Sequence, residues 1–245
     1  MEWSDDALVL SVRAHGETSA ILEVLTRVHG RHLGLVRGGA SRRTKPVLQP
    51  GNTVHLGWRA RLSEHLGNFT VEPAKSRAGD MMEKRVALIG LNAFTAVAGA
   101  ALPEREQHES VFEVGEILLD AMAEDGFAHW APLYVRWEAG LLEALGFGLD
   151  LSRCASTGAT DDLRFVSPRS GRAVSGAAAA PYKERLFALP GFLLGSQNSD
   201  PAAHDIAAGL RLTGHFLLER ALAPHGREMP RARLRLDELA ARESQ

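Results

Sequence analysis

The chain has 245 residues, 45% hydrophobic and 24% charged, so it is long enough to bury a core and too apolar for general disorder. Its 28 Lys and Arg against 30 Asp and Glu give a net charge of −2, and its single cysteine excludes an internal disulfide and a cysteine-only metal cage. The acidic start at Met1–Asp6 lacks the apolar segment of a signal peptide, and the uncharged Val86–Leu102 is slightly short for a membrane span, so we expect a buried helix there.

The charge is unevenly distributed along the chain. Residues 1–78 carry eleven Lys or Arg against seven acids, whereas residues 79–245 carry 17 basic and 23 acidic residues. Between Val24 and Ser63 there is no acid, but there are eight Lys or Arg and three histidines. Such a basic surface favours a polyanion such as nucleic acid, because contacts with phosphates release counterions. The alternative is a basic face that pairs with acids from elsewhere in the fold.

Five β-prone segments follow one another in the first 78 residues. Gly, Pro or polar turns separate them, and the fourth segment alternates between apolar and polar residues. Short strands with glycines at their bends are typical of a small barrel of the OB type. The expected strands are Ala7–Arg13, Ala20–Arg27, His32–Arg37, Thr53–Arg61 and Asn68–Glu72.

Helical periodicity replaces this pattern from Met81 onward, where apolar residues recur every three or four positions. Asp200 as the N-cap and Pro201 at the first helical position predict the start of a long helix. Pro224 and Gly226 predict its end. The expected helices are Met81–Leu102, Glu109–Ala123, Trp130–Leu145, Pro201–Ala223 and Pro230–Glu243.

The two patterns together predict an α+β fold with two domains. Residues 1–78 are expected to form a five-stranded, nucleic-acid-binding OB-fold barrel, and residues 79–245 a mostly α-helical domain. A segment near 150–178, rich in Ser, Gly and Arg, interrupts the helical pattern and is expected to be irregular or a short hairpin. Apolar packing must hold that segment in place, through Leu149, Leu151, Leu163, Phe165 and Val166.

The sequence contains no group of residues with the spacing of a catalytic site. It has no phosphate-binding loop, dinucleotide fingerprint, nucleophile elbow or His-Glu-x-x-His motif. Glu113 and Glu116 share a helix face but belong to an acidic run, Glu104–Asp125, that is typical of a solvated face. Cys154 has no neighbouring base and is expected to be a buried, inert thiol. We therefore expect no enzymatic activity and no cofactor; the alternative is an unrecognised metal-free enzyme with its site in the helical domain.

Several motifs, in order along the chain, are similar to those of the bacterial DNA repair family RecO. They are Ala7–Ser19, Leu35–Arg43 and Leu48–Gly51 in the barrel, and Arg136–Glu138, Leu141–Cys154 and Val166–Gly171 further on. The resemblance implies an OB-fold barrel, a helical domain and a non-enzymatic recombination mediator in the cytoplasm, associated with the nucleoid. It implies binding of single- and double-stranded DNA and annealing of complementary strands. It also implies action with RecR to load RecA onto DNA coated by the single-stranded-DNA-binding protein (SSB), whose tail family members can contact.

The sequence departs from this family at the zinc site. Many members hold zinc with two Cys-x-x-Cys pairs, whereas the corresponding segments here are Cys154–Thr157 and Ser175–Ala178. One thiolate of four cannot form a tetrahedral site from cysteines. We therefore expect no zinc in this chain.

The candidate DNA-binding residues come from the acid-free part of the barrel. They are Arg31, Arg37, Arg42, Arg43, Lys45, Arg59 and Arg61. Arg42, Arg43 and Lys45 are expected on the loop after the third strand, and Arg59 and Arg61 on one face of the fourth strand. Trp58 is expected to face the core, so binding should be mostly electrostatic and independent of sequence. An OB scaffold that binds RNA or protein, without annealing activity, is the alternative function.

A second basic cluster lies near the C-terminus and is expected to extend the DNA path or to bind an acidic peptide. Its members are Arg211, Arg220, Arg227, Arg231, Arg233 and Arg235. Because the SSB tail is acidic and ends in hydrophobic residues, its site should combine a cation with an apolar pocket. Arg136, beside Trp137, is the candidate for this role; an ion pair of Arg136 with Glu138 or a neighbouring acid is the alternative.

Overall fold

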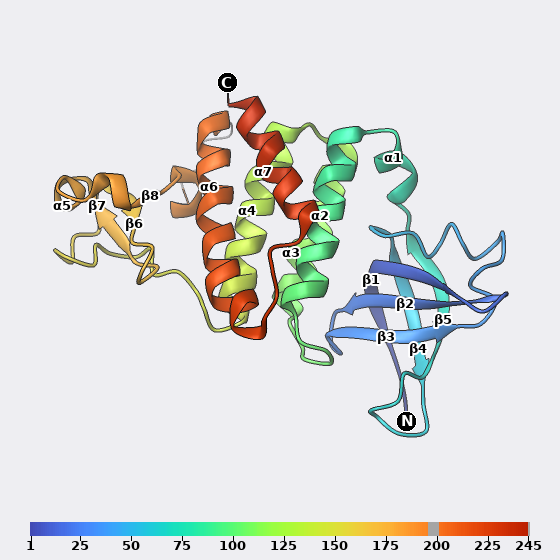
Figure 1. Ribbon diagram of the computed structural model, residues 1–245. Coiled ribbons are helices and arrows are strands. Elements are labelled where there is room, and N and C mark those ends of the chain that lie inside the picture. Colours follow the sequence, from blue (N-terminus) through green and yellow to red (C-terminus); the bar gives the residue numbers. More distant parts are fainter. Residues whose placement is uncertain (196–200, 245) are drawn as a thin grey trace. The chain divides into compact units, whose positions relative to one another are not determined.

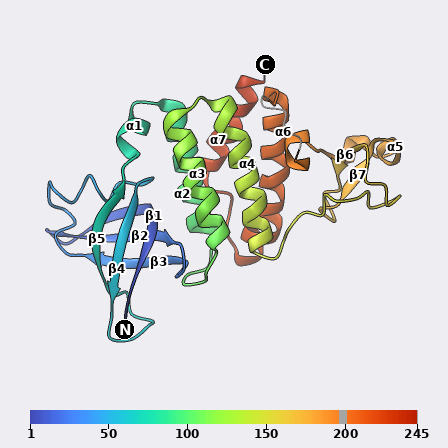
Figure 2. The same cartoon turned by 180° about the vertical axis from the view of Figure 1, so that it is seen from behind.

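The computed structural model describes residues 1–195 and 201–244, which form two compact units, Met1–Asp125 and Gly126–Gln245. The first unit contains the barrel and the three helices that follow it (Figures 1 and 2). The division expected at residue 78 therefore marks the end of the barrel but not the end of the first compact unit.

The five strands of the first unit form a closed barrel in the order β1-β2-β3-β5-β4. They are β1 (Glu2–His15), β2 (Ser19–Thr26), β3 (Arg31–Val36), β4 (Thr53–Arg59) and β5 (Asn68–Lys75). β1 is long enough to pair antiparallel with β4 through its first half and with β2 through its second. The predicted five-stranded OB barrel and the α+β class are confirmed.

The barrel core consists of the apolar side chains that alternate along these strands. Leu22, Val24 and Leu56 are fully buried, and Trp58 is 3% exposed, so the expectation that Trp58 faces the core is confirmed. Burial of each such side chain contributes about 1.5–3 kcal/mol. Strand alternation leaves His55 and Arg59 exposed on the outside of β4.

Three helices complete the first unit: α1 (Ala78–Met82), α2 (Arg85–Ala101) and α3 (Glu109–Glu124). The single helix expected over Met81–Leu102 is two helices, because Lys84 adopts an extended conformation between them. α2 buries Phe94, Val97 and Ala98, as expected for a core helix. No helix in the described residues is long and apolar enough to cross a membrane.

The second unit is built on three packed helices, α4 (Phe127–Ala144), α6 (Ala203–Phe216) and α7 (Arg231–Glu243). α6 continues as a π-helix, η3 (Leu217–Leu222), and a short 3-10 turn, η4 (Ala223–His225). The predicted N-cap Asp200 lies outside the described residues, and α6 begins at Ala203 rather than at Pro201.

A small three-stranded sheet occupies the expected irregular segment and lies to one side of these helices (Figures 1 and 2). Its hairpin is one of the two forms that the sequence predicted for this segment. Leu163 and Val166 are buried as expected, whereas Phe165 is only partly buried. The elements here are β6 (Leu163–Val166), β7 (Ala173–Ser175), α5 (Gly176–Ala179), η1 (Lys183–Arg185), β8 (Phe187–Ala188) and η2 (Gly191–Leu194).

Candidate nucleic-acid interface

A groove of about 570 Å³ lies on the barrel where its wall is weakest. β3 and β5 pair through only two residues of each strand, Leu35 with Asn68 and Val36 with Phe69. The chain then leaves β3 for a long loop, so the wall opens beyond Val36. We call this opening the barrel groove; its lining includes Val36, Arg37, Thr44, Arg59, Asn68, Phe69, Thr70 and Val71.

Two of the predicted cations, Arg37 and Arg59, lie together in the barrel groove. Arg37 is exposed and has no acidic partner among the described residues. The Arg59 side chain is 84% exposed, and Glu2, 77% exposed, is 3.9 Å away. Such an exposed pair is weak and screened by salt, so it leaves Arg59 able to exchange Glu2 for a phosphate.

The loop between β3 and β4, residues 37–52, carries the predicted cations Arg42, Arg43 and Lys45, and we call it the basic loop. Its base is fixed, because Leu48 is fully buried and the Asn52 side chain donates to the carbonyl oxygens of Pro46 and Val47 at 3.0 and 3.2 Å. The three cations are exposed, and none has an ion-pair partner in the described residues. A second hollow, of about 510 Å³, is lined by Arg42 and Lys45.

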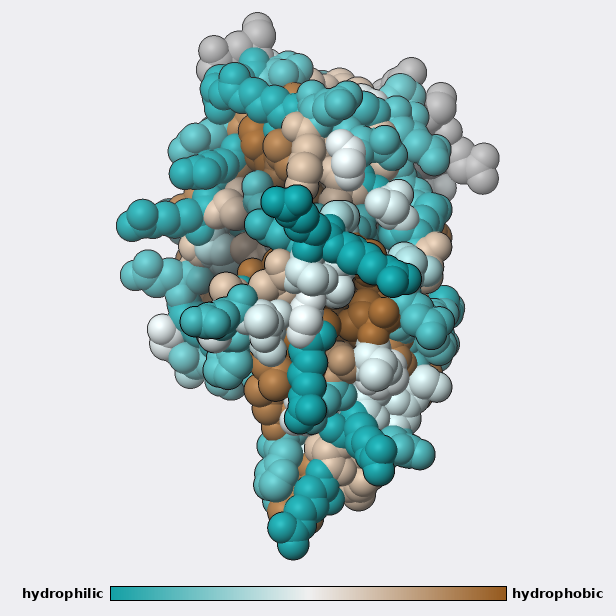
Figure 3. Space-filling view, turned by 90° about the vertical axis from the view of Figure 1, so that its right-hand side faces the viewer, coloured by the Kyte–Doolittle hydropathy of each residue, from teal (hydrophilic) through white to brown (hydrophobic). Residues whose placement is uncertain are grey.

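Figure 3 faces the barrel and shows long hydrophilic side chains projecting around apolar patches. The paired basic face that the charge count allowed as an alternative is present in part, because Arg27, Arg31 and Arg59 have acidic partners, whereas the cations of the basic loop have none in the described residues. The acids of α3 also have basic partners: Glu113 pairs with Arg27 at 2.7 Å, and Asp120 pairs with Arg77 at 2.6 Å. The acidic face of α3 is therefore partly neutralised rather than simply solvated.

Arg77, which the sequence did not single out, organises this neutralisation. Its side chain is 3% exposed and donates to Thr53 Oγ1 at 2.6 Å, joining β4 to α3 through Glu116 and Asp120. Burial acts to raise the pKa of Asp120, but hydrogen bonds from Arg77 and Lys75 outweigh it and lower that pKa. A buried arginine with several protein partners has a structural role, and Arg77 belongs to the frame of the unit.

Arg31 corrects the expectation for the DNA-binding set. Its side chain is 10% exposed, its Nε donates to Leu102 O at 2.8 Å, and its Nη1 donates to Glu23 Oε1 at 2.6 Å. These bonds fix the guanidinium between β2 and the end of α2 and leave it little surface for a phosphate. Arg31 therefore stabilises the first unit and is removed from the interface.

Arg61 also differs from its expected place. β4 ends at Arg59, so Arg61 lies in the following loop and does not share a strand face with Arg59. It is exposed, without an ion-pair partner in the described residues. Arg61 remains a candidate DNA-binding residue on that loop, but it does not line the barrel groove.

The second basic cluster is divided by burial. Arg233 is fully buried: its Nε donates to Glu138 Oε1 at 2.6 Å and its Nη2 to Glu138 Oε2 at 2.9 Å. Arg220 donates to Phe147 O at 3.3 Å, and its guanidinium carbon lies 4.4 Å from the centre of the Phe216 ring. Both are structural, which corrects their assignment to a ligand-binding cluster. The exposed members are Arg211, Arg227, Arg231 and Arg235.

Arg136 has no acidic partner among the described residues, and its guanidinium carbon lies 6.0 Å from the centre of the Phe192 ring. Its Nε and Nη2 donate to Phe192 O at 3.2 and 2.9 Å, tying α4 to η2. The alternative ion pair with Glu138 is wrong, because both carboxylate oxygens of Glu138 bind Arg233. Arg136 is exposed, and its role toward an SSB tail stays a prediction.

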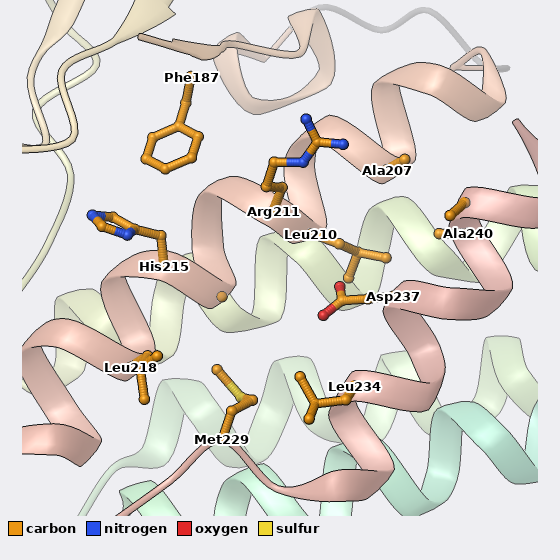
Figure 4. A pocket seen from close by; sticks show the side chains of 12 residues that line it. Phe187, Ala207, Leu210, Arg211, His215, Leu218, Met229, Leu234, Asp237 and Ala240 are labelled. Atoms are coloured by element: carbon orange, nitrogen blue, oxygen red, sulfur yellow. The ribbon is translucent and has the colours of Figure 1, made fainter. Parts of the chain in front are cut away.

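An apolar hollow of about 460 Å³ lies on the second unit between α6 and α7. Figure 4 shows Leu210, Arg211 and His215 from α6 and Leu234 from α7 around it. This hollow places the cation Arg211 beside apolar side chains, the combination expected for an acidic tail with a hydrophobic end, and Asp237 adds one carboxylate to the lining. The sequence analysis named Arg211 in a cluster that could bind an acidic peptide, but it missed the hollow, because the walls come from segments that meet only in the fold.

The segments that correspond to the zinc-binding pairs do meet in the structure. The Ser175 amide donates to Cys154 Sγ at 3.3 Å, and hydrogen bonds from Ser175 and Thr157 lower the pKa of the Cys154 thiol to about 6. One thiol and two hydroxyl groups are a poor donor set for zinc. The described residues contain no cluster of three or more His, Cys, Asp or Glu that could hold a metal.

Comparisons with known proteins agree with this architecture. Residues 1–77 match the family described as Recombination protein O N terminal, and residues 82–228 match Recombination protein O C terminal. The chain is 54% identical over 244 residues to the DNA repair protein RecO of Cereibacter sphaeroides strain ATCC 17023, covering 99% of this chain and 100% of that protein. It is 53% identical to the DNA repair protein RecO of Phenylobacterium zucineum strain HLK1, covering 96% and 95% of the two chains. With both family descriptions matched in order and these relatives aligned over nearly their whole length, the chain belongs to the RecO family.

Proposed function

We propose that this chain is a DNA repair protein and recombination mediator that binds single- and double-stranded DNA through the barrel groove and the basic loop. The observation that carries the proposal is the set of exposed cations there without ion-pair partners in the described residues: Arg37, Arg42, Arg43 and Lys45. Free cations release counterions from DNA when they meet its phosphates, and this release drives binding that is independent of sequence.

The same surface supports annealing of complementary strands. A protein that holds DNA by its phosphates leaves the base edges free to pair, and neutralised strands repel one another less. The function requires no bond to be made or broken, so we propose a mediator without enzymatic activity that works in the cytoplasm on nucleoid DNA.

The proposed action with RecR, RecA and SSB is supported by membership of the RecO family. Because the named relatives are DNA repair proteins RecO, we propose that this chain also acts with RecR to load RecA onto SSB-coated DNA. For the SSB tail, the hollow between α6 and α7 fits better than Arg136, since it joins Arg211 to an apolar lining. Substitution R211A should weaken binding of an SSB tail peptide more than R136A does; the reverse order would assign the tail to Arg136.

Annealing of two complementary oligonucleotides, followed by fluorescence transfer between labels, tests the proposal. The native protein should accelerate pairing, and the triple variant R42A/R43A/K45A should lose most of that acceleration. The matched control is R153A/R169A/R185A, which removes three exposed cations of the second unit and should anneal as the native protein does. No acceleration by the native protein would instead favour an RNA-binding or protein-interaction scaffold.

A further inference from the structure

A further hollow of the first unit, of about 410 Å³ and lined by the N-terminal residues of β1, differs from the barrel groove in its chemistry. Aromatic rings make up much of its lining, and one arginine stands beside them. The lining consists of Met1, Glu2, Trp3, His29, His32, Trp58, Ser63 and Arg105, so it also holds one carboxylate. Such a combination of rings and a cation is suited to a planar, partly charged ligand.

Three of these rings form a continuous column. The His29 ring stacks on Trp3 with centroids 4.1 Å apart and planes 6° from parallel, and Trp3 stacks on Trp58 at 5.6 Å and 20°. Trp58 anchors the inner end, since it is 3% exposed and its Nε1 donates to Leu66 O at 3.1 Å. The His29 side chain, 33% exposed, forms the outer end.

The outer ring is held in position from behind. His29 Nδ1 lies 2.9 Å from Asp5 Oδ2, and the same oxygen accepts the Val28 amide at 2.8 Å. The Asp5 side chain is 6% exposed, so this anchor is part of the frame rather than a flexible surface contact. An aromatic column that is fixed at both ends and partly exposed at His29 is already arranged to receive one more planar ring.

Arg105 stands beside the column in an unusual backbone conformation. Its φ is +63°, in the left-handed region, and its amide donates to Arg31 O at 2.8 Å. Its Nη2 donates to the carbonyl oxygens of Glu64 and His65, at 3.2 and 3.1 Å, which holds the guanidinium against the β4–β5 loop. Backbone strain that the surroundings maintain is found preferentially at functional sites.

The hollow is next to the barrel groove, because Glu2 of the hollow lies 3.9 Å from Arg59 of the groove. The ring of Trp3 in the hollow is also 6.3 Å from that of Phe69, which lines the groove. We propose that this hollow holds one unpaired nucleobase of a strand bound in the groove, stacked on the His29–Trp3–Trp58 column, with Arg105 beside its phosphate or base edge. This inference rests on the proposed DNA binding. It adds preference for single strands to a surface whose cations alone do not distinguish single from double strands, since duplex bases are already stacked.

The test compares a labelled oligothymidine with an oligomer of the same length whose central nucleotides are abasic, by fluorescence anisotropy. The native protein should bind the oligothymidine about five- to tenfold more tightly than the abasic oligomer. This ratio lies at the lower end of what stacking of one base on an aromatic ring contributes. H29A should lose this preference, whereas H29F, which keeps a ring on Trp3, should retain most of it. The salt dependence of binding should stay the same in all three proteins, since no phosphate contact is removed. Quenching of tryptophan emission by the oligothymidine, and not by the abasic oligomer, should accompany native binding.

The outcomes separate this inference from the proposed function. Equal affinity for both oligomers, with strong salt dependence, would overturn the stacking site and leave DNA binding intact. Binding of neither oligomer would overturn both. Loss of affinity for an acidic SSB tail peptide in H29A, with unchanged oligomer preference, would show that the hollow is a peptide site and would also overturn the inference.

Discussion

Arg233 of α7 and Glu138 of α4 form an ion pair in which both side chains are fully buried. Two hydrogen bonds join them, at 2.6 and 2.9 Å, and Arg233 Nη2 also donates to Leu210 O at 2.8 Å. The pair therefore links the three long helices of the second unit. A buried charge whose partner is removed keeps its desolvation cost without compensation.

Substitution R233A should consequently destabilise the second unit by about 3–5 kcal/mol, because it leaves Glu138 buried and unpaired. The matched control is R235A, which removes an exposed arginine two residues away and should change stability by less than about 0.5 kcal/mol. Urea unfolding measured by circular dichroism compares the two. Equal stability of both variants would contradict the structural role of Arg233.

His32 predicts a pH dependence for the first unit. Burial is the largest cause that lowers its pKa below 6.5; a hydrogen bond to Leu33 O opposes this, and Arg105 adds to the lowering. The folded state thus binds fewer protons than the unfolded state. The contribution of neutral His32 is present above pH 6.5 and is lost as the pH falls through the lower folded pKa.

The urea concentration at the unfolding midpoint of the first unit should therefore decrease when the pH is lowered from about 7 to about 5. His29, Glu104 and Arg105 act on His32 electrostatically, and its ring packs against Trp3, Trp58 and Phe69. H32Q should flatten this dependence, while H55Q, at an exposed position on β4, should leave it unchanged. A urea midpoint of the native protein that increases as the pH is lowered would contradict this role of His32.

Gly30, in the turn between β2 and β3, should not tolerate a side chain. Its φ is +69°, and a Cβ atom there would lie 2.0 Å from the Glu106 carbonyl oxygen. Because both the conformation and the backbone contact oppose a side chain, G30A should cost about 2–4 kcal/mol. G16A, also at positive φ but with no atom near its Cβ, isolates the conformational part and should cost clearly less. Thermal unfolding of the two variants measures the difference.

Removal of metal should leave the second unit unchanged. The segments that correspond to the family's Cys-x-x-Cys pairs offer one thiol, of Cys154, with Thr157 and Ser175 beside it, and the thiol already accepts hydrogen bonds. Prolonged treatment with EDTA should therefore not shift the unfolding temperature, and metal analysis of the purified protein should find no stoichiometric zinc. A lower unfolding temperature after EDTA would show that a metal stabilises the fold.

Sequence periodicity predicted the strands of the barrel and most helices, because the pattern of apolar and polar residues that marks a strand or a helix is local in the sequence. It could not separate free cations from structural ones, because the partners that bury them are distant in sequence: Leu102 for Arg31 and Glu138 for Arg233. The sequence did not predict the break between α1 and α2, because the residue at the break is Lys84 rather than Gly or Pro. The aromatic column was also missed, because Trp3 and Trp58 meet only through strand pairing and His29 was counted as a charge rather than as a ring.

The central claim, that the basic loop contacts DNA phosphates, is tested most directly by the anisotropy of a labelled single strand across a salt series. The logarithm of affinity falls with the logarithm of salt by about 0.7 for each phosphate contact. If all three cations contact phosphates, R42A/R43A/K45A should bind more weakly at low salt and show a slope shallower by about 2. The control R153A/R169A/R185A should keep the native slope. Identical slopes for the native protein and the basic-loop variant would contradict the claim.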